Sequence, residues 1–155
     1  MQLDRRWIGA HIPHAGKMCL LDAVLDWDAN RIECRTSTHR DADNPLRSHG
    51  RLGSACGVEY AAQAMAVHGA LLAARSGAPA AGFLVGLRRV LLHVTRLDDI
   101  ETDLLISGER INADAVSAMY QFSVHNAARP FLSGRATVVL DAAALARTDR
   151  ARRPS

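Results

Sequence analysis

Apolar and polar positions alternate over residues 31–36 (RIECRT). A period of two residues predicts a strand with one buried face and one face in water. The stretch before it, LLDAVLDW, predicts a second short strand, and turn-forming residues lie between the two at positions 28–30. The pattern therefore predicts a hairpin near the start of the chain, followed by a loop over residues 39–54, which are rich in Asp, Asn, Pro, Gly and Ser.

A long helix is predicted over residues 55–76, which are rich in alanine, contain no proline and precede Gly77 and Pro79. The segment is apolar almost all round, which is typical of a central buried helix. Glu59 and Gln63 are exceptions that lie one helical turn apart, so Gln63 can hydrogen-bond Glu59. A charge among apolar residues is costly unless it is paired or used. We therefore expect this part of the helix to belong to a functional site.

Four further strand-like runs follow the helix, at residues 83–94, 101–111, 118–126 and 130–140. The connections between them are short, so we expect neighbouring runs to pair as antiparallel hairpins. One long buried helix followed by antiparallel strands is an α+β layout, with a curved sheet of four to six strands wrapped around the helix. The exposed edge of such a sheet is an aggregation liability unless it is paired, which predicts a homodimer.

Length and composition indicate a single globular domain over residues 1–141 and a basic tail over residues 142–155, which we expect to be disordered from about residue 147. No apolar run is long enough to predict a membrane span or a signal peptide. The three cysteines are odd in number and form no CxxC pair, which argues against disulfides and a zinc–cysteine site and fits a reducing cytoplasm.

The net charge of +3 raises the question of a nucleic-acid partner, but only 5% of the residues are aromatic. A nucleic-acid-binding face more often combines basic residues with stacking rings, so we expect no nucleic-acid partner. A mildly basic surface also suits an acidic protein partner. The pair His11 and His14 forms an HxxH, but Pro13 lies between them and further ligands are missing, so no metal or cofactor is expected.

Two stretches resemble the 3-hydroxyacyl-acyl carrier protein dehydratases of the FabZ/FabA type. HIPHAGKMCLLDAVLDWD is similar to their N-terminal IPH…LLxD segment, and GVEYAAQAMA is similar to their central helix, with Glu59 and Gln63 as the acid and the glutamine. GFLVGLRRVLLHVTRLDDIETDLLI also looks like a strand–turn–strand segment of that family. The resemblance is strongest to predicted dehydratases of aryl-polyene-type clusters, and it implies the hot-dog fold.

The resemblance implies a reaction in which a 3-hydroxyacyl thioester loses water. In that family a histidine removes the proton next to the thioester carbonyl and a carboxylic acid protonates the leaving hydroxyl. Glu59 is then the expected acid and His49 the expected base, reaching Glu59 from the other subunit, with His14 as the alternative base. We expect the substrate to contact Gln63, His14 and the backbone N–H groups of Cys56 and Gly57, which would bind the thioester carbonyl.

The loop before the helix departs from the family pattern. His49 stands in RSHGRLG without the family's Phe-Pro, and Glu59 follows it by only ten residues, a shorter spacing than in typical members. That spacing is closer to a hot-dog thioesterase, and the altered motif also fits a non-catalytic partner in a mixed dimer with a related hot-dog protein. The expected partner is an acidic acyl carrier protein, facing arginines 47, 51, 88, 89 and 96.

Overall fold

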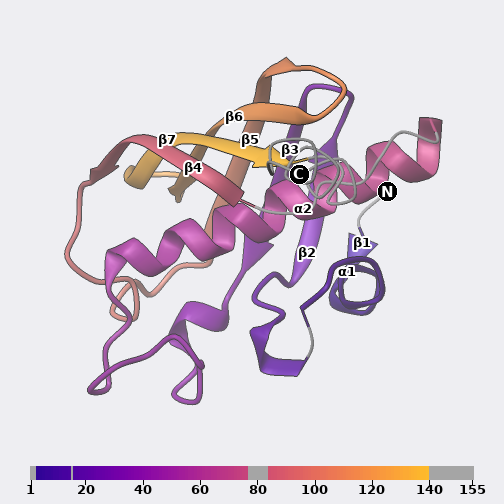
Figure 1. Ribbon diagram of the computed structural model, residues 1–155. Coiled ribbons are helices and arrows are strands. Elements are labelled where there is room, and N and C mark those ends of the chain that lie inside the picture. Colours follow the sequence, from indigo (N-terminus) through magenta and orange to yellow (C-terminus); the bar gives the residue numbers. More distant parts are fainter. Residues whose placement is uncertain (1–2, 15, 77–83, 140–155) are drawn as a thin grey trace, which may run out of the picture.

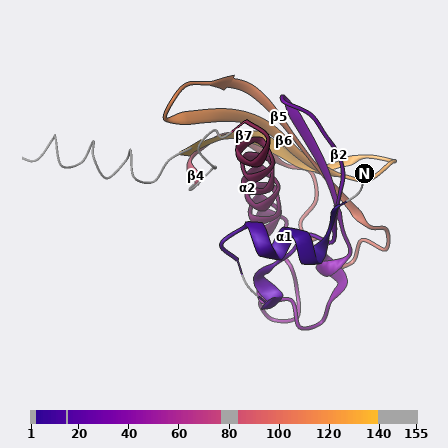
Figure 2. The same ribbon diagram turned by 90° about the vertical axis from the view of Figure 1, so that its right-hand side faces the viewer.

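Seven antiparallel strands form one curved sheet, and one long helix lies against its inner face (Figures 1 and 2). The computed structural model describes residues 3–14, 16–76 and 84–139 of the 155-residue chain. The strand order is β1-β2-β3-β5-β6-β7-β4. The strands are β1 (Leu3–Asp4), β2 (Ala23–Trp27), β3 (Arg31–Thr36), β4 (Leu84–Leu92), β5 (Leu104–Ala113), β6 (Ser117–His125) and β7 (Pro130–Val139). This is the hot-dog fold that the sequence predicted.

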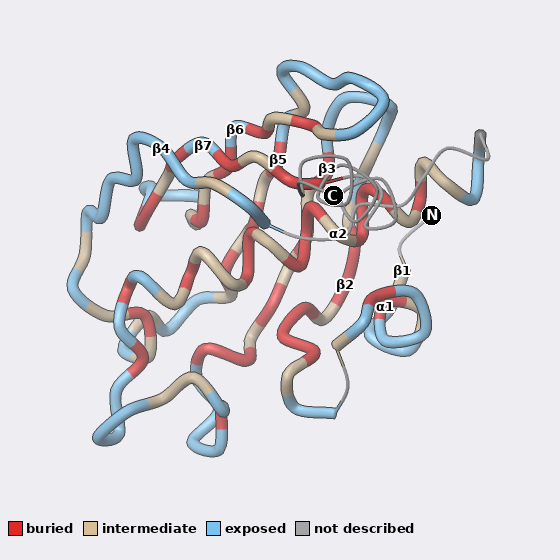
Figure 3. Tube along the Cα trace, viewed as in Figure 1, coloured by how far each residue is buried: buried red, intermediate tan, exposed pale blue. Residues whose placement is uncertain are grey.

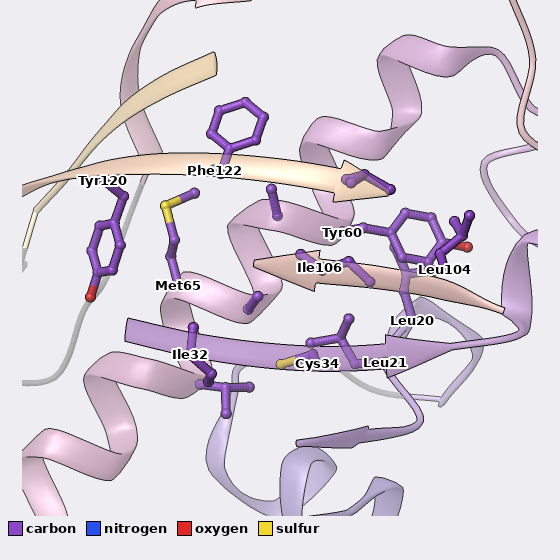
Figure 4. Close-up of a cluster of buried hydrophobic side chains, with 14 of the residues drawn as sticks. Leu20, Leu21, Ile32, Cys34, Tyr60, Met65, Leu104, Ile106, Tyr120 and Phe122 are labelled. Carbon is purple, nitrogen blue, oxygen red and sulfur yellow. The ribbon is translucent and has the colours of Figure 1, made fainter. Parts of the chain in front are cut away.

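Helix α2 (Gly57–Ser76) is the central element of the core, as its apolar composition predicted. Its buried side chains meet buried residues of β3, β5 and β6 (Figure 4). Gly108 of β5 lies at the centre of this contact, where a Cβ atom would be in ordinary van der Waals distance of Ile32, Tyr120 and Met65. The labelled core residues in Figure 4 are Leu20, Leu21, Ile32, Cys34, Tyr60, Met65, Leu104, Ile106, Tyr120 and Phe122.

The predicted hairpin near the start of the chain and the predicted pairing of the last three strands are confirmed. β2 pairs with β3 around the turn at residues 28–30, and β5, β6 and β7 form successive antiparallel pairs. Asp28 fixes the first turn, because its carboxylate accepts hydrogen bonds from the N–H groups of Asn30 and Arg31. Asp114 and Asn126 accept in the same way in the two later turns.

The predicted pairing of the run at 83–94 with the run at 101–111 is wrong, and so is the predicted strand number. β4 pairs with β7, while β5 pairs with β3 and β6. The connection between β4 and β5 does not turn back at once: Leu97 N–H donates to Leu52 O, and Asp98 accepts from Leu52 N–H. These bonds hold the connection against the loop before α2, and β5 enters the sheet on the far side of β6 and β7.

The start of the chain forms two elements that the pattern did not predict. Helix α1 (Arg5–His11) begins where the Asp4 carboxylate accepts a hydrogen bond from Trp7 N–H, and β1 pairs with β2. Asp4 is a normal helix N-cap residue, so the signal was present in the sequence. The predicted disordered tail, and Gly77 and Pro79 after the helix, lie outside the described residues.

The two edges of the sheet differ in length and cover. β1 is two residues long and runs directly into α1. β4 is nine residues long and, within the part of the chain that the structure describes, is paired along one side only. Among the described residues, six of the eight large exposed hydrophobic side chains belong to β4 (Figure 3): Leu84, Val85, Leu87, Val90, Leu91 and Leu92. An exposed edge of this length and composition is suited to pairing with another strand.

Candidate active site

The side chain of Gln63 binds the backbone of the short segment 16–20, which follows His14 in the chain, and joins this segment to helix α2. The Gln63 Oε1 atom accepts a hydrogen bond from Leu20 N–H at 2.9 Å, and Nε2 donates to Met18 O at 2.6 Å. Gln63 is completely buried. Because a buried amide is costly unless its donor and acceptor are both used, this two-way bond fixes the segment relative to the helix.

This arrangement brings His14 onto Glu59, in the first turn of α2. The His14 Nε2 atom lies 3.1 Å from Glu59 Oε1, and Gln63 Nε2 donates a longer hydrogen bond of 3.5 Å to the same oxygen. The predicted contact between Gln63 and Glu59 is therefore confirmed. His14 Nδ1 is buried and has no hydrogen-bond partner within the described part of the chain. Nε2 is thus the ring nitrogen that faces the carboxylate.

The His14–Glu59 pair lies at the surface of the single chain and not in its core. The side chains are 27% and 35% exposed, respectively, so the prediction of a buried Glu59 is wrong for one chain. The surrounding residues of α2 are apolar, but Glu59 stands where the helix meets the segment after α1. Water, substrate or a second chain can reach its carboxylate there.

His49 lies in the loop that precedes α2. It is exposed in a tight turn in which Ser48 and Arg51 exchange backbone hydrogen bonds, and its φ of 52° places it in the left-handed region next to Gly50. Within the described chain no interaction joins His49 to Glu59. The structure therefore brings together His14, Glu59 and Gln63 and leaves His49 apart from them.

The start of α2 differs from the predicted oxyanion-binding site. The N–H of Cys56 donates to Gly53 O, and the N–H of Gly57 donates to carbonyls of Ser54 and Ala55, so a 3-10 turn (Ser54–Cys56) already uses both donors. A Cβ atom on Gly57 would lie 2.5 Å from a methyl carbon of Leu132, so glycine is needed there for helix–sheet packing. Burial raises the pKa of the Cys56 thiol, the opposite of the lowered value that a nucleophile needs.

Three other histidines have structural contacts, namely His11, His39 and His68. His68 is buried in α2 between Tyr120 Oη at 2.6 Å and Asp28 O at 2.7 Å, and burial lowers its pKa, as expected for an interior histidine. His11 stacks on Trp7, and its Nδ1 atom pairs with Trp7 O. Buried His39 was not predicted from the sequence; its Nε2 atom lies 3.0 Å from Ile100 O.

The backbone anchors Met18 and Leu20 were also missed as part of the site. A backbone carbonyl and N–H carry no residue-specific signal, although the IPH…LLxD segment that contains them did stand out. In the part of the chain that the structure describes, no cluster of three or more His, Cys, Asp or Glu residues could hold a metal ion. No described helix is long and apolar enough to cross a membrane.

Comparison with solved structures shows the same fold in several proteins. The dehydratase heterocomplex ApeI:P from Xenorhabdus doucetiae matches with a TM-score of 0.78 at 20% identity, covering 91% of this chain and 95% of the other. Zebra fish thioesterase superfamily member 2 matches with a TM-score of 0.60 at 17% identity, covering 89% and 99% of the two chains. AziG from S. sahachiroi matches at 0.59 and 13% identity, covering 76% and 88%. At these identities the likeness establishes the fold alone.

The sequence comparisons are more specific. The comparison with curated proteins finds no match for the chain. The family model described as ApeP dehydratase matches residues 7–147, which include the whole His14–Glu59–Gln63 arrangement and most of the sheet. A match over nearly the full chain decides between the dehydratase and thioesterase neighbours of this fold: the chain belongs to the ApeP-like dehydratase family.

Proposed function

We propose that the protein removes water from a 3-hydroxyacyl thioester carried by an acyl carrier protein, with the His14–Glu59 pair as its base and acid. The observation that carries this proposal is the 3.1 Å contact between His14 Nε2 and Glu59 Oε1 at a half-exposed position. Loss of water takes a proton from one carbon and a hydroxyl from the next. A base and an acid held side by side can serve two adjacent carbons.

The reaction balances with these two groups alone. Neutral His14 accepts the proton from the carbon next to the thioester carbonyl, and the electron pair left behind forms the carbon–carbon double bond. The carbon–oxygen bond breaks as Glu59, in its acid form, protonates the leaving hydroxyl, and water departs. The proton now on His14 returns to the Glu59 carboxylate across their hydrogen bond, which restores the starting state.

Gln63 acts in this proposal as a positioning residue. Its amide is fully engaged with Leu20, Met18 and Glu59, and it has no exposed surface for substrate. It holds the segment next to His14 at a fixed position along the helix that carries Glu59. Hydrogen bonds of this kind matter because a small misplacement of a catalytic group costs a large factor in rate.

The proposed carrier partner is acidic, as the positive net charge favours. Two of the five arginines expected to meet it are already engaged: Arg96 pairs with Asp98, and Arg47 donates to Gly50 O and His39 O. Arg51, exposed beside His49, and Arg88 and Arg89 on β4 stay available to a partner. The reducing cytoplasm is the proposed compartment, and all three cysteines are free thiols.

The test compares two thioesters on two carriers. A 3-hydroxyacyl thioester and a saturated acyl thioester are each supplied on an acyl carrier protein and on coenzyme A, and both enoyl product and free thiol are measured. We expect enoyl product from the hydroxyacyl carrier thioester and no thiol release. The rate should fall as salt screens the attraction between the protein and the carrier. Thiol release without enoyl product would establish a thioesterase instead, and equal rates on coenzyme A at all salt concentrations would exclude a role for the carrier.

A second candidate function is that of a non-catalytic partner of a related dehydratase. The long exposed edge of β4 favours a second hot-dog chain, and the ApeI:P structure is described as a heterocomplex. Under this candidate the isolated chain gives neither product, while its addition increases the activity of the related chain and Glu59→Gln leaves that increase unchanged. If the Glu59→Gln chain no longer increases the activity of the related chain, the catalytic role belongs to this chain.

A further inference from the structure

The residue after Glu59 in α2 is a tyrosine that lies in the core. Tyr60 is completely buried, although its side chain ends in a polar group. Phenylalanine would fill the same space without the cost of burying a hydroxyl, which is offset only when the hydroxyl is hydrogen-bonded. The Tyr60 Oη atom lies 2.8 Å from Thr38 Oγ1 and 2.9 Å from Asn44 Nδ2. The hydroxyl is therefore fully bonded, and its partners show what it holds in place.

Counting hydrogen atoms gives the direction of the hydrogen bonds in this network. Thr38 has one hydroxyl hydrogen, which it donates to Leu20 O at 2.7 Å. Tyr60 must then be the donor in its contact with Thr38, and the Asn44 amide donates to Tyr60 in turn. Burial raises the pKa of Tyr60, which keeps its hydroxyl protonated for this role. The result is a directed chain of hydrogen bonds that starts in the loop before α2 and ends on the Leu20 carbonyl.

Leu20 is consequently held on both sides of its backbone. Its carbonyl accepts hydrogen bonds from Thr38 and from Thr36 of β3, while its N–H donates to Gln63 of α2. A carbonyl oxygen has two lone pairs, so the two hydroxyls occupy both of them. Any shift of Leu20 along the helix breaks at least one buried hydrogen bond, which is costly.

The residue before Leu20 extends this constraint to His14. The Cys19 thiol is buried and donates to the His14 carbonyl at a sulfur–oxygen distance of 3.4 Å. The His14 ring contacts Glu59, which precedes Tyr60 in α2. Helix α2 therefore holds the histidine ring through Glu59 and, farther along the chain, the Leu20 carbonyl through Tyr60.

We propose that Tyr60 is a positioning residue, which holds His14 beside Glu59 by fixing the backbone to which the histidine is bonded. Its effect passes through Thr38 and Leu20 and not through contact with substrate. Its effect on the rate rests on the proposed function, whereas its effect on position rests on the hydrogen bonds alone. Without the Tyr60 hydroxyl, Thr38 loses a buried hydrogen bond and Leu20 is held less firmly, so segment 16–20 should open more often.

Two tyrosine-to-phenylalanine variants test this proposal, because the chain offers a matched control. Tyr120 is also completely buried, and its Oη atom is part of a second network, with His68 and Arg110. Figure 4 shows Tyr60 and Tyr120 at opposite ends of the labelled cluster. Tyr60→Phe and Tyr120→Phe each remove one buried hydroxyl and keep the ring. Both should lower the melting temperature, but only Tyr60→Phe should loosen segment 16–20.

Amide hydrogen exchange at Leu20, followed by NMR, measures how firmly the segment is held without any substrate. Tyr60→Phe should increase the exchange rate about tenfold, the factor expected for the loss of one buried hydrogen bond, and Tyr120→Phe should leave it near the wild-type value. On the 3-hydroxyacyl carrier thioester, kcat of Tyr60→Phe should fall by about 10- to 10²-fold at unchanged KM, because the base is misplaced while substrate contacts remain. Tyr120→Phe should keep the wild-type kcat.

Variants of Thr38 keep the test decisive if Tyr60→Phe folds poorly. Thr38→Ser keeps the hydroxyl and should retain kcat and slow exchange at Leu20, whereas Thr38→Val removes the hydroxyl and should behave like Tyr60→Phe. Equal exchange at Leu20 in Tyr60→Phe and Tyr120→Phe, or faster exchange with an unchanged kcat, would overturn the proposal. If the wild-type chain shows no dehydration, the proposed function fails, while the exchange rates still decide whether Tyr60 holds the segment.

Discussion

His14 and His49 differ in how firmly the structure holds them, although the sequence predicts either one as the catalytic base. His14 lies in a segment whose backbone is held by Gln63, and its own ring contacts Glu59. His49 lies at the exposed tip of a turn, and its backbone is left-handed. A catalytic group must be held close to its productive geometry, and the contact of His14 with Glu59 meets this requirement within one chain.

The comparison shows how a buried amide can make an active-site segment rigid. The segment after α1 contains little regular structure, yet two hydrogen bonds with Gln63 join it to the central helix. A third hydrogen bond links Gln63 to the acid, Glu59. The turn around His49 is joined to the rest of the protein only at its flanks among the described residues, where Arg47 donates to His39 O and Leu52 N–H donates to Asp98. Among the described residues, the side chain of His49 forms no hydrogen bond or ion pair with Glu59.

Glu59→Gln gives the largest expected effect. The amide has nearly the same shape as the carboxylate but cannot donate the proton to the leaving hydroxyl, so the dehydration rate should fall by about 10²–10⁴-fold. Stability should change little, because the side chain is half-exposed. Glu109→Gln is the matched control, since Glu109 is an exposed glutamate of β5. A fully active Glu59→Gln variant would show that Glu59 has no catalytic role and only complements the helix dipole.

Gln63→Leu should affect both stability and rate. The change leaves the buried N–H of Leu20 and the carbonyl of Met18 without their partner, at roughly 1–3 kcal/mol for each buried group. The free energy of unfolding from chemical denaturation and kcat should fall together, because the His14 segment loses its anchor. Gln63→Glu keeps an acceptor for Leu20 and loses the donor to Met18, so it should lie between wild type and Gln63→Leu. Unchanged stability in Gln63→Leu would show that the segment is held by other contacts.

Asp22, just beyond the anchored segment, predicts a pH effect on stability. Burial alone would raise the pKa of Asp22, but hydrogen bonds from Arg5 and Ser37 outweigh it and lower the pKa below the usual value. A lowered pKa contributes stability above the unfolded-state value near 4, and that contribution is lost as the pH falls through the folded-state value. Asp22→Asn should therefore be less stable than wild type at pH 7 and should lose less stability on acidification. Parallel pH curves for the two proteins would contradict this.

Lys17→Ala should have the smallest effect. Lys17 forms an ion pair with Asp43 that joins the His14 segment to the loop before α2, but both side chains are more than half exposed. Exposed pairs contribute about 0–1 kcal/mol, so the melting temperature and kcat should stay near the wild-type values. A loss as large as that of Gln63→Leu would mean that the surface pair, and not the buried amide, fixes the segment.

The sequence predicted most of the fold because its signals are local. The period of two in residues 31–36, the turn residues at 28–30 and the apolar helix all appear in the structure at nearly the predicted positions. The position of β4 could not be predicted in this way. Hairpin pairing was the expectation for short connections, whereas the actual order depends on Leu97 and Asp98 binding the distant backbone of Leu52.

The candidate site was predicted in part for a related reason. The spacing of Glu59 and Gln63 follows from helix geometry, so their contact was foreseeable. The position of His14 on Glu59 depends on Gln63 reaching backbone atoms of Met18 and Leu20, which residue types do not reveal. The donors expected at Cys56 and Gly57 are used by a 3-10 turn whose formation the glycine-rich sequence did not indicate.

The most direct test is the dehydration rate of His14→Gln beside His49→Gln, measured on the same 3-hydroxyacyl carrier thioester. Glutamine can place an amide where the Nε2 atom of His14 lies, but it does not accept a proton near neutral pH. His14→Gln should lose about 10²–10⁴-fold in rate, while His49→Gln stays close to wild type. A full loss in His49→Gln with an active His14→Gln would contradict the account and place the base on the exposed turn of a neighbouring chain.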